Sequence, residues 1–262
     1  MTLYLHECKR GLKSFLIWSL SLGLLAVICL MLYPEMKDQS AQLNDMFSGL
    51  GSFTSAFGMD VLGFADAMGF YGIECGACLG LGGGLYAAFL GSGMISKEES
   101  GHTAEFLYTN PLSRTQILLQ KYAALITQLI GFNLVWALFS LGSFAYIGEE
   151  PAWKAFLLFQ FAQFVLQLEL ATFSFLFSAF LGRSSLGAGI GLMAAMYFLS
   201  MWGNISDSVD GVQFITPYWY ADASRVIADA QIDGKLMLLG VLYLVIALLI
   251  TIVGYNRKDI TA

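Results

Sequence analysis

The chain of 262 residues is strongly apolar: 57% of its residues are hydrophobic, 12% are charged, and its mean hydropathy is +0.69. Soluble domains are roughly 45 to 50% apolar even with glycine included. The composition therefore excludes an ordinary soluble protein and predicts an integral membrane protein. The net charge of −6 argues against nucleic acid as a partner.

Six segments are long and apolar enough to cross a bilayer. A helix of about 20 largely apolar residues crosses a hydrocarbon core of roughly 30 Å. The predicted spans are residues 15–33, 71–95, 117–147, 153–181, 186–205 and 236–255. We expect an all-α, polytopic membrane protein with one transmembrane domain over 1–262. Its outer loops would be 34–70, which could form short surface helices, and 206–235, and its largest inner loop 96–116.

Positive charge predicts the orientation of these spans. If the N-terminus is cytoplasmic, nine of the thirteen Lys and Arg residues lie inside and four outside. Cytoplasmic loops carry an excess of Lys and Arg, so both termini should be cytoplasmic. The first apolar run, 15–33, is longer than the core of roughly 7 to 15 residues in a cleaved secretory signal, and we expect an uncleaved span.

An amphipathic pattern precedes the first span. Four apolar residues share one helix face, namely Leu5, Cys8, Leu12 and Phe15, and the charged residues point elsewhere, namely Glu7, Lys9, Arg10 and Lys13. This pattern predicts a short helix lying in the inner membrane interface.

The inner loop between the second and third spans carries its own helix signals. Thr103 can cap a short helix with Glu105 in its first turn, and Pro111 ends it. Ser113 and Gln116 match a capping box that begins the third span. Three apolar residues at the centre of the loop either contact another protein or anchor the loop in the lipid headgroups: Phe106, Leu107 and Tyr108.

The motifs of this loop, together with others along the chain, resemble those of the type-2 ATP-binding-cassette (ABC) transporter permeases. In the loop they are Glu98-Glu-Ser-Gly101, Ala104-Glu105-Phe-Leu, Asn110-Pro-Leu-Ser113-Arg114 and Lys121. Elsewhere they are Ser55 to Asp60, Gly69-Phe-Tyr71, Thr216 to Arg225 with Ile232-Asp233, and Tyr255 to Ile260. The resemblance covers nearly the whole chain, including the number of spans.

The resemblance implies a permease subunit of an ABC exporter in a bacterial plasma membrane. In that family, the loop after the second span docks onto a cytosolic ATPase subunit. The expected docking residues here are Glu98, Glu99, Gly101, Thr103, Glu105, Phe106, Leu107, Tyr108, Pro111 and Arg114. The chain has no G-x-x-x-x-G-K-[ST] motif. ATP and Mg would therefore be bound by the partner ATPase, with no catalytic residue, metal or cofactor in this chain.

Small residues repeat every four positions in two spans. The second span has Gly72, Gly76, Gly80, Gly84 and Ala88, and the fifth has Gly187, Gly191 and Ala195. Such stripes allow close approach of helices, either inside one chain or between subunits. The resemblance favours a subunit interface for the fifth span, since family permeases work as pairs, surrounded by membrane lipids, with this span near the contact.

The fourth span carries the expected substrate-pathway residues. Its polar stripe consists of Gln160, Gln163, Gln167, Ser174 and Ser178, and it either lines a cavity or bonds to a neighbouring helix. Glu169 lies on the opposite face at mid-membrane depth. It is either a functional carboxylate or a structural partner of Gln128 or Asn133 in the third span.

Three other classes of function compete with a permease. An ion-coupled secondary transporter could use Glu169, although such a carrier needs no docking loop. The sequence also leaves open a regulatory subunit that has no substrate pathway of its own. An intramembrane protease is disfavoured because no predicted span contains Asp and neither His6 nor His102 lies in an H-E-x-x-H motif. Cys75 and Cys78 match C-x-x-C, but without a second pair or a nearby histidine we expect the cysteines to be small packing residues.

Overall fold

A computed structural model describes residues 2–49, 51–100, 113–181, 184–205 and 211–257, and every regular element in these ranges is helical. The long helices are α1 (Thr2–Met31), α7 (Gly84–Ser100), α9 (Arg114–Ile147), α10 (Trp153–Leu181), α11 (Ser185–Ile205) and α13 (Gly234–Arg257). The prediction of an all-α protein is therefore confirmed.

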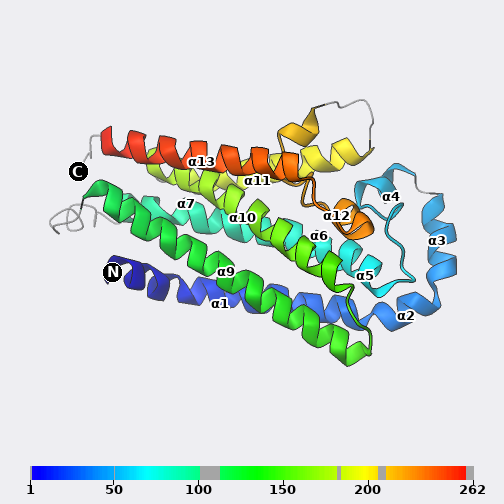
Figure 1. Ribbon diagram of the computed structural model, residues 1–262. Helices are drawn as coiled ribbons and strands as arrows, with labels where there is room; N and C mark the ends of the chain where they lie inside the picture. The colour runs from blue at the N-terminus through cyan, green and yellow to red at the C-terminus, as the bar shows by residue number, and fades with distance from the viewer. Residues whose placement is uncertain (1, 50, 101–112, 182–183, 206–210, 258–262) are drawn as a thin grey trace.

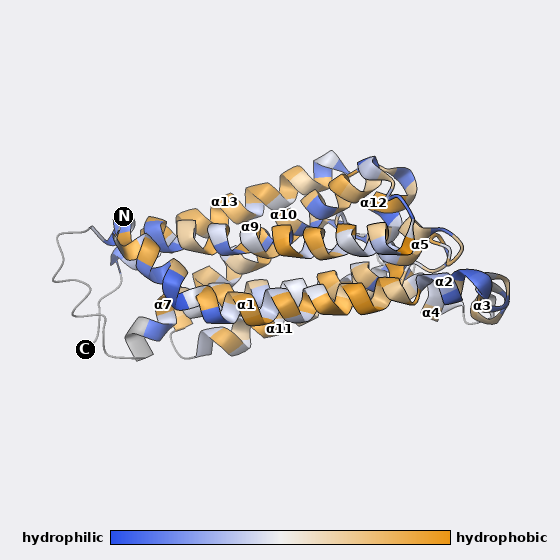
Figure 2. Cartoon of the chain, turned by 90° about the horizontal axis from the view of Figure 1, so that it is seen from below, coloured by the Kyte–Doolittle hydropathy of each residue, from blue (hydrophilic) through white to orange (hydrophobic). Residues whose placement is uncertain are grey.

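Six helical stretches are long and apolar enough to span a membrane, as predicted. They are Leu3–Asp38, Ala67–Lys97, Arg114–Ile147, Trp153–Leu181, Ser185–Ile205 and Gly234–Arg257. Apolar residues cover most of their length, and hydrophilic residues gather near the two ends of the bundle (Figure 2). The start of α1 and the end of α13 lie at the same end (Figure 1), as an even number of crossings requires.

The N-terminal region differs from the prediction. No break separates an interfacial helix from the first span, because α1 is one continuous helix. Leu5 and Leu12 are each 50% exposed, whereas Glu7 is only 6% exposed. The apolar side chains of Leu5 and Leu12 thus face outward, whereas the Glu7 carboxylate faces the bundle, where it has a cationic partner described below.

The second span is interrupted by two π-helical turns. It stacks α5 (Ala67–Phe70), η1 (Tyr71–Cys75), α6 (Gly76–Cys78) and η2 (Leu79–Gly83) onto α7. Asp66 caps its start by accepting a hydrogen bond from Gly69 N at 2.8 Å. Turns of this kind occur frequently at functional sites. Here they lie in the glycine-rich stretch, where small residues let other elements approach the backbone.

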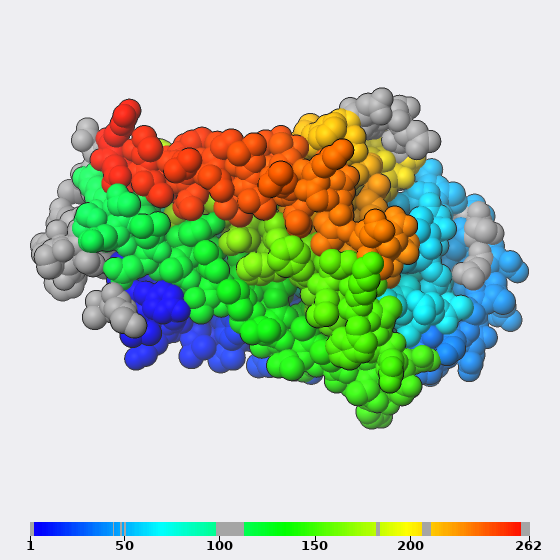
Figure 3. Space-filling view, viewed as in Figure 1, coloured from blue at the N-terminus to red at the C-terminus, as the bar shows by residue number. Residues whose placement is uncertain are grey.

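Helix α10 lies at the centre of the bundle. It packs along α7 and also contacts α9, α11 and α13, while α1 packs along α9. Its apolar residues Phe159, Leu166 and Phe175 are fully buried. In the space-filling view α10 lies between α13 and α9 (Figure 3). Side chains on α10 are therefore placed to contact most of the other spans.

Short helices cover the end of the bundle that we assign to the outer side (Figure 1). They are α2 (Tyr33–Asp38), α3 (Ser40–Ser48), α4 (Ser52–Ala56), η4 (Val212–Phe214) and α12 (Ala223–Asp229). Residues 216–222, between η4 and α12, pack onto the second span: Tyr218 OH donates a hydrogen bond to Gly80 O at 3.1 Å. We call residues 212–229 the outer segment.

Candidate functional site

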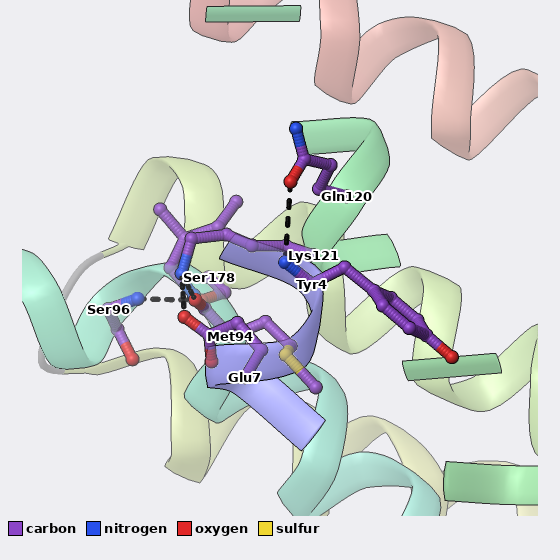
Figure 4. A network of polar contacts seen from close by, with 8 residues as sticks. Tyr4, Glu7, Met94, Ser96, Gln120, Lys121 and Ser178 are labelled. Atoms are coloured by element: carbon purple, nitrogen blue, oxygen red, sulfur yellow. Dashed lines mark hydrogen bonds and ion pairs between the residues drawn. The ribbon is translucent and has the colours of Figure 1, made fainter. Parts of the chain in front are cut away.

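The predicted docking loop lies mostly outside the described residues. This applies to Gly101, Thr103, Glu105, Phe106, Leu107, Tyr108 and Pro111. Glu98 and Glu99 belong to the last turn of α7, and Arg114 is the first residue of α9. What the structure shows is the support from which the loop projects, which we call the loop base: Tyr4, Glu7, Met94, Ser96, Gln120, Lys121 and Ser178 (Figure 4).

The loop returns to the membrane through a well-defined helix start. Ser113 Oγ accepts a hydrogen bond from Gln116 N at 3.2 Å, and Gln116 Oε1 accepts one from Ser113 N at 3.1 Å. The predicted capping box is confirmed. Arg114 Nη1 also donates to the carbonyls of Tyr255 and Asn256 at 3.4 Å each. A cation near a helix C-terminus is favourable, so Arg114 ties the start of α9 to the end of α13.

A buried ion pair forms the centre of the loop base. Lys121 Nζ lies 2.8 Å from Glu7 Oε1 and donates to Met94 O at 2.8 Å. The Lys121 side chain is 1% exposed and that of Glu7 7%. Buried charges are stable only when they are paired and hydrogen-bonded. The pair joins α1, α7 and α9 at the end where the loop begins and ends (Figure 4).

Serine hydroxyl groups connect the end of α7 to α10 and α11. Ser178 Oγ of α10 accepts hydrogen bonds from Ile95 N and Ser96 N, each at 2.9 Å. Ser92 Oγ donates to Ser185 O of α11 at 3.1 Å. On the α1 side, Tyr4 N donates to Gln120 Oε1 of α9 at 3.3 Å. The last turns of α7 are thus fixed to neighbours on both sides, and movement of the loop should reach the bundle directly.

The polar stripe of α10 bonds mainly to neighbouring elements. Gln163 Nε2 donates to Ala221 O at 2.9 Å, and Gln167 Oε1 accepts from Asn133 Nδ2 at 2.7 Å. Ser174 packs against the α7 and α11 glycines Gly91 and Gly189. Bonding to neighbours therefore describes Gln163, Gln167 and Ser178, whereas the Gln160 side chain and the Ser174 hydroxyl are buried without a hydrogen-bond partner among the described residues.

One member of the stripe also lines a cavity near the outer end. The cavity has a volume of about 70 Å³. It is lined by Gly72, Gly76, Gly80, Gln163, Tyr197, Asn204, Tyr218 and Asp222, among others. A cavity needs roughly 10 to 15 Å³ to hold one water molecule, so several water molecules fit in this one. Gln163 Oε1 is buried without a partner among the described residues, and such a water can supply one.

Glu169 has a partner that the sequence did not suggest. Its Oε2 accepts a hydrogen bond from Tyr220 OH at 2.9 Å, and a Cβ added to Gly240 of α13 would lie 2.6 Å from the same oxygen. The proposed partners Gln128 and Asn133 are not bonded to it in the described structure, because Glu169 faces α13 whereas Asn133 meets the opposite face of α10. Glu169 therefore connects α10 to the outer segment.

An arginine in the outer segment is held by three neighbouring side chains. Arg225 Nη2 donates to Asn204 Oδ1 at 2.7 Å, and Asn204 Nδ2 donates to Asp222 Oδ2 at 3.0 Å. The Arg225 guanidinium lies 3.6 Å from the centre of the Trp219 ring. Burial lowers the pKa of Arg225 from its ordinary value, and the Asp222 carboxylate opposes this change. The group fixes the outer segment against the end of α11.

The two glycine stripes have different surroundings. In the second span, Gly76 faces Ala223, and both Gly80 and Gly84 face Tyr218, so the outer segment of the same chain covers this stripe. In the fifth span, Gly187 and Gly191 have open space where a Cβ would stand, with no described neighbour within 4 Å. Only the fifth-span stripe is available to another subunit.

The sequence matches a known protein family. A family model described as "ABC-2 family transporter protein" matches residues 1–260, which include all six spans and the loop base. No curated protein matches the sequence.

Proposed function

Because the chain belongs to the ABC-2 transporter family, we propose that it is the membrane-spanning permease subunit of an ATP-driven exporter in the bacterial plasma membrane. The observation that carries the proposal is the loop base, where the Lys121–Glu7 pair joins three helices beneath the predicted docking loop. If an ATPase moves the loop, such a support is needed for the movement to reach the spans. Without it, the movement would only deform the loop.

In this mechanism a separate cytosolic ATPase subunit binds ATP and Mg and contacts the loop around Thr103 to Tyr108. Its movement is passed to α7 and α9 through the loop base. Helix α7 continues the second span, whose glycine face contacts the outer segment. The hydrogen bond between Tyr218 and Gly80 therefore links the moving span to the outer end. Access to the cavity lined by Gln163 would change with this movement.

The test is co-purification of an ATPase subunit. The chain is expressed with its chromosomal neighbours, purified in mild detergent, and compared with the Leu107→Arg variant. We expect an ATP-hydrolysing subunit with the native chain and its loss in the variant, because a charge disrupts an apolar contact. The matched control is Val61→Arg, since Val61 is 58% exposed at the opposite end. An ATPase that binds the Leu107→Arg variant as well as the native chain would refute docking through this loop.

We further propose that two permease subunits pair through α11, because Gly187 and Gly191 leave an uncovered surface there. Gly191→Leu should lower the dimer fraction measured by light scattering in detergent, since its side chain holds the helices apart. Gly142→Leu is the control, as Gly142 also has no neighbour within 4 Å but lies on α9. An unchanged mass for Gly191→Leu, or an equal loss for both variants, would count against this interface.

Ion-coupled transport through Glu169 is the second candidate. The observation that favours it is a carboxylate only 2% exposed whose described hydrogen-bond partner is the single phenol of Tyr220. If no ATPase co-purifies with the native chain, this candidate becomes the leading one. Transport by purified protein in vesicles, driven by an ion gradient without ATP and lost in Glu169→Gln, would then establish it.

A further inference from the structure

Three cysteines meet between the first and second spans. Cys75 Sγ donates to Ala26 O at 3.8 Å, and residues three apart on a helix share a face, which brings Cys29 of α1 to the same place. Helix α1 also packs against η1, which ends at Cys75, and against α6, which ends at Cys78. The C-x-x-C pair of the second span therefore has a third thiol beside it, supplied by another helix.

The position and surroundings of the thiols favour redox chemistry over metal binding. The described residues include no group of three or more His, Cys, Asp or Glu that could hold a metal ion. Cys29 is two residues from the end of α1 at Met31, close to the short helices of the outer end. The outer side of a membrane is the oxidising side, where disulfides persist. Cys29 and Cys78 are partly exposed, so a reagent dissolved in the membrane can reach them.

We propose that Cys29 forms a reversible disulfide with Cys75 or Cys78, which links the first span covalently to the second. Two S–H bonds break and one S–S bond forms, and the two electrons and two protons pass to a membrane-soluble quinone, which becomes the quinol. A dithiol reverses the reaction by exchange through a mixed disulfide. The bridge would fix α1 to the π-helical part of the second span, whose far end carries the docking loop.

The sequence allows a direct test by peptide mapping. Trypsin cleaves after Lys13, Lys37 and Lys97, so Cys29 falls in peptide 14–37 and both Cys75 and Cys78 fall in 38–97. The full chain in detergent is treated with a short-chain ubiquinone analogue. Remaining thiols are then alkylated, and the digest is analysed without reductant by mass spectrometry. We expect the two peptides joined, and their separation after treatment with a dithiol.

Variants identify which thiols react. Cys29→Ser should abolish the joined peptides, Cys75→Ser and Cys78→Ser should each retain them through the other cysteine, and the double variant should lose them. Cys8→Ser is the control and should change nothing, because Cys8 lies in a different tryptic peptide. Gel filtration confirms that each variant is folded. Joined peptides that persist in Cys29→Ser, a bridge confined to peptide 38–97, or no bridge after oxidation would overturn the proposal. None of these outcomes depends on ATPase coupling.

Discussion

A Lys121→Met variant is expected to lose roughly 3 to 5 kcal/mol of unfolding free energy, because it leaves the Glu7 carboxylate buried without its cation. Lys121 Nζ and Glu7 Oε1 are 2.8 Å apart, and neither side chain is more than 7% exposed. Methionine has nearly the length of lysine, so the change removes the charge with little loss of packing. Thermal unfolding in detergent, followed by the loss of helical signal, measures the effect.

The chain provides a matched control for this prediction. Lys37 Nζ and Glu149 Oε1 are 2.7 Å apart, but their side chains are 48% and 35% exposed. Water and salt screen such a pair, and Lys37→Met should leave the melting temperature unchanged. The double variant Glu7→Leu with Lys121→Met should recover most of the lost stability, because neither charge then stays buried alone. Equal melting temperatures for Lys121→Met and Lys37→Met would show that the buried pair does not stabilise the loop base.

The second large effect is expected at the contact between α7 and α10. A Cβ added to Gly91 would collide with the backbone oxygen Ala171 O, which cannot rotate away. Gly91→Ala should therefore force α7 and α10 apart and cost roughly 1 to 3 kcal/mol, as overpacking does in well-packed cores. The melting temperature in detergent measures the change. Because α7 leads into the predicted docking loop, any ATPase activity of the assembled complex should fall with it.

A glycine-to-alanine substitution in α11 should not lower the stability as it does in α7. Gly187 in α11 has no described neighbour within 4 Å of an added Cβ. Alanine is favoured over glycine inside a helix by roughly 0.5 to 1 kcal/mol, so Gly187→Ala should be neutral or slightly stabilising in the monomer. If Gly91→Ala behaves like Gly187→Ala, the two helices are not in the close contact that the structure shows.

Features that depend on neighbouring residues in the sequence were predictable. The six spans follow from local hydropathy, and the helices confirm them. The capping box at Ser113 and Gln116 follows from a spacing of three residues, and both of its hydrogen bonds are present. In each case the chemistry that decides the structure lies within one helix, so no knowledge of the packing is needed.

Features that depend on packing between distant residues were not predictable. Glu7 and Lys121 are 114 residues apart, and no periodicity connects them. Four charged residues lie on α1, and nothing in the sequence distinguishes Glu7 from Lys9, Arg10 and Lys13 as the one that meets a partner. The amphipathic pattern of α1 likewise did not show that Glu7 faces the bundle while Leu5 and Leu12 face outward. The third thiol at Cys29 was missed because it comes from a different span.

The contact between the outer segment and the second span also has a thermodynamic consequence. Tyr218 OH donates a hydrogen bond to Gly80 O, and the helix that contains Gly80 continues through η2 and α7 toward the predicted docking loop. If a cytosolic subunit shifts this helix, the free energy of coupling is the same in both directions, since linkage between two binding sites is reciprocal. If an antibody fragment binds residues 212–229 more weakly after the helix has shifted, it would lower the affinity of the chain for the cytosolic subunit. The factor would equal the one by which the cytosolic subunit lowers the affinity of the chain for the antibody fragment.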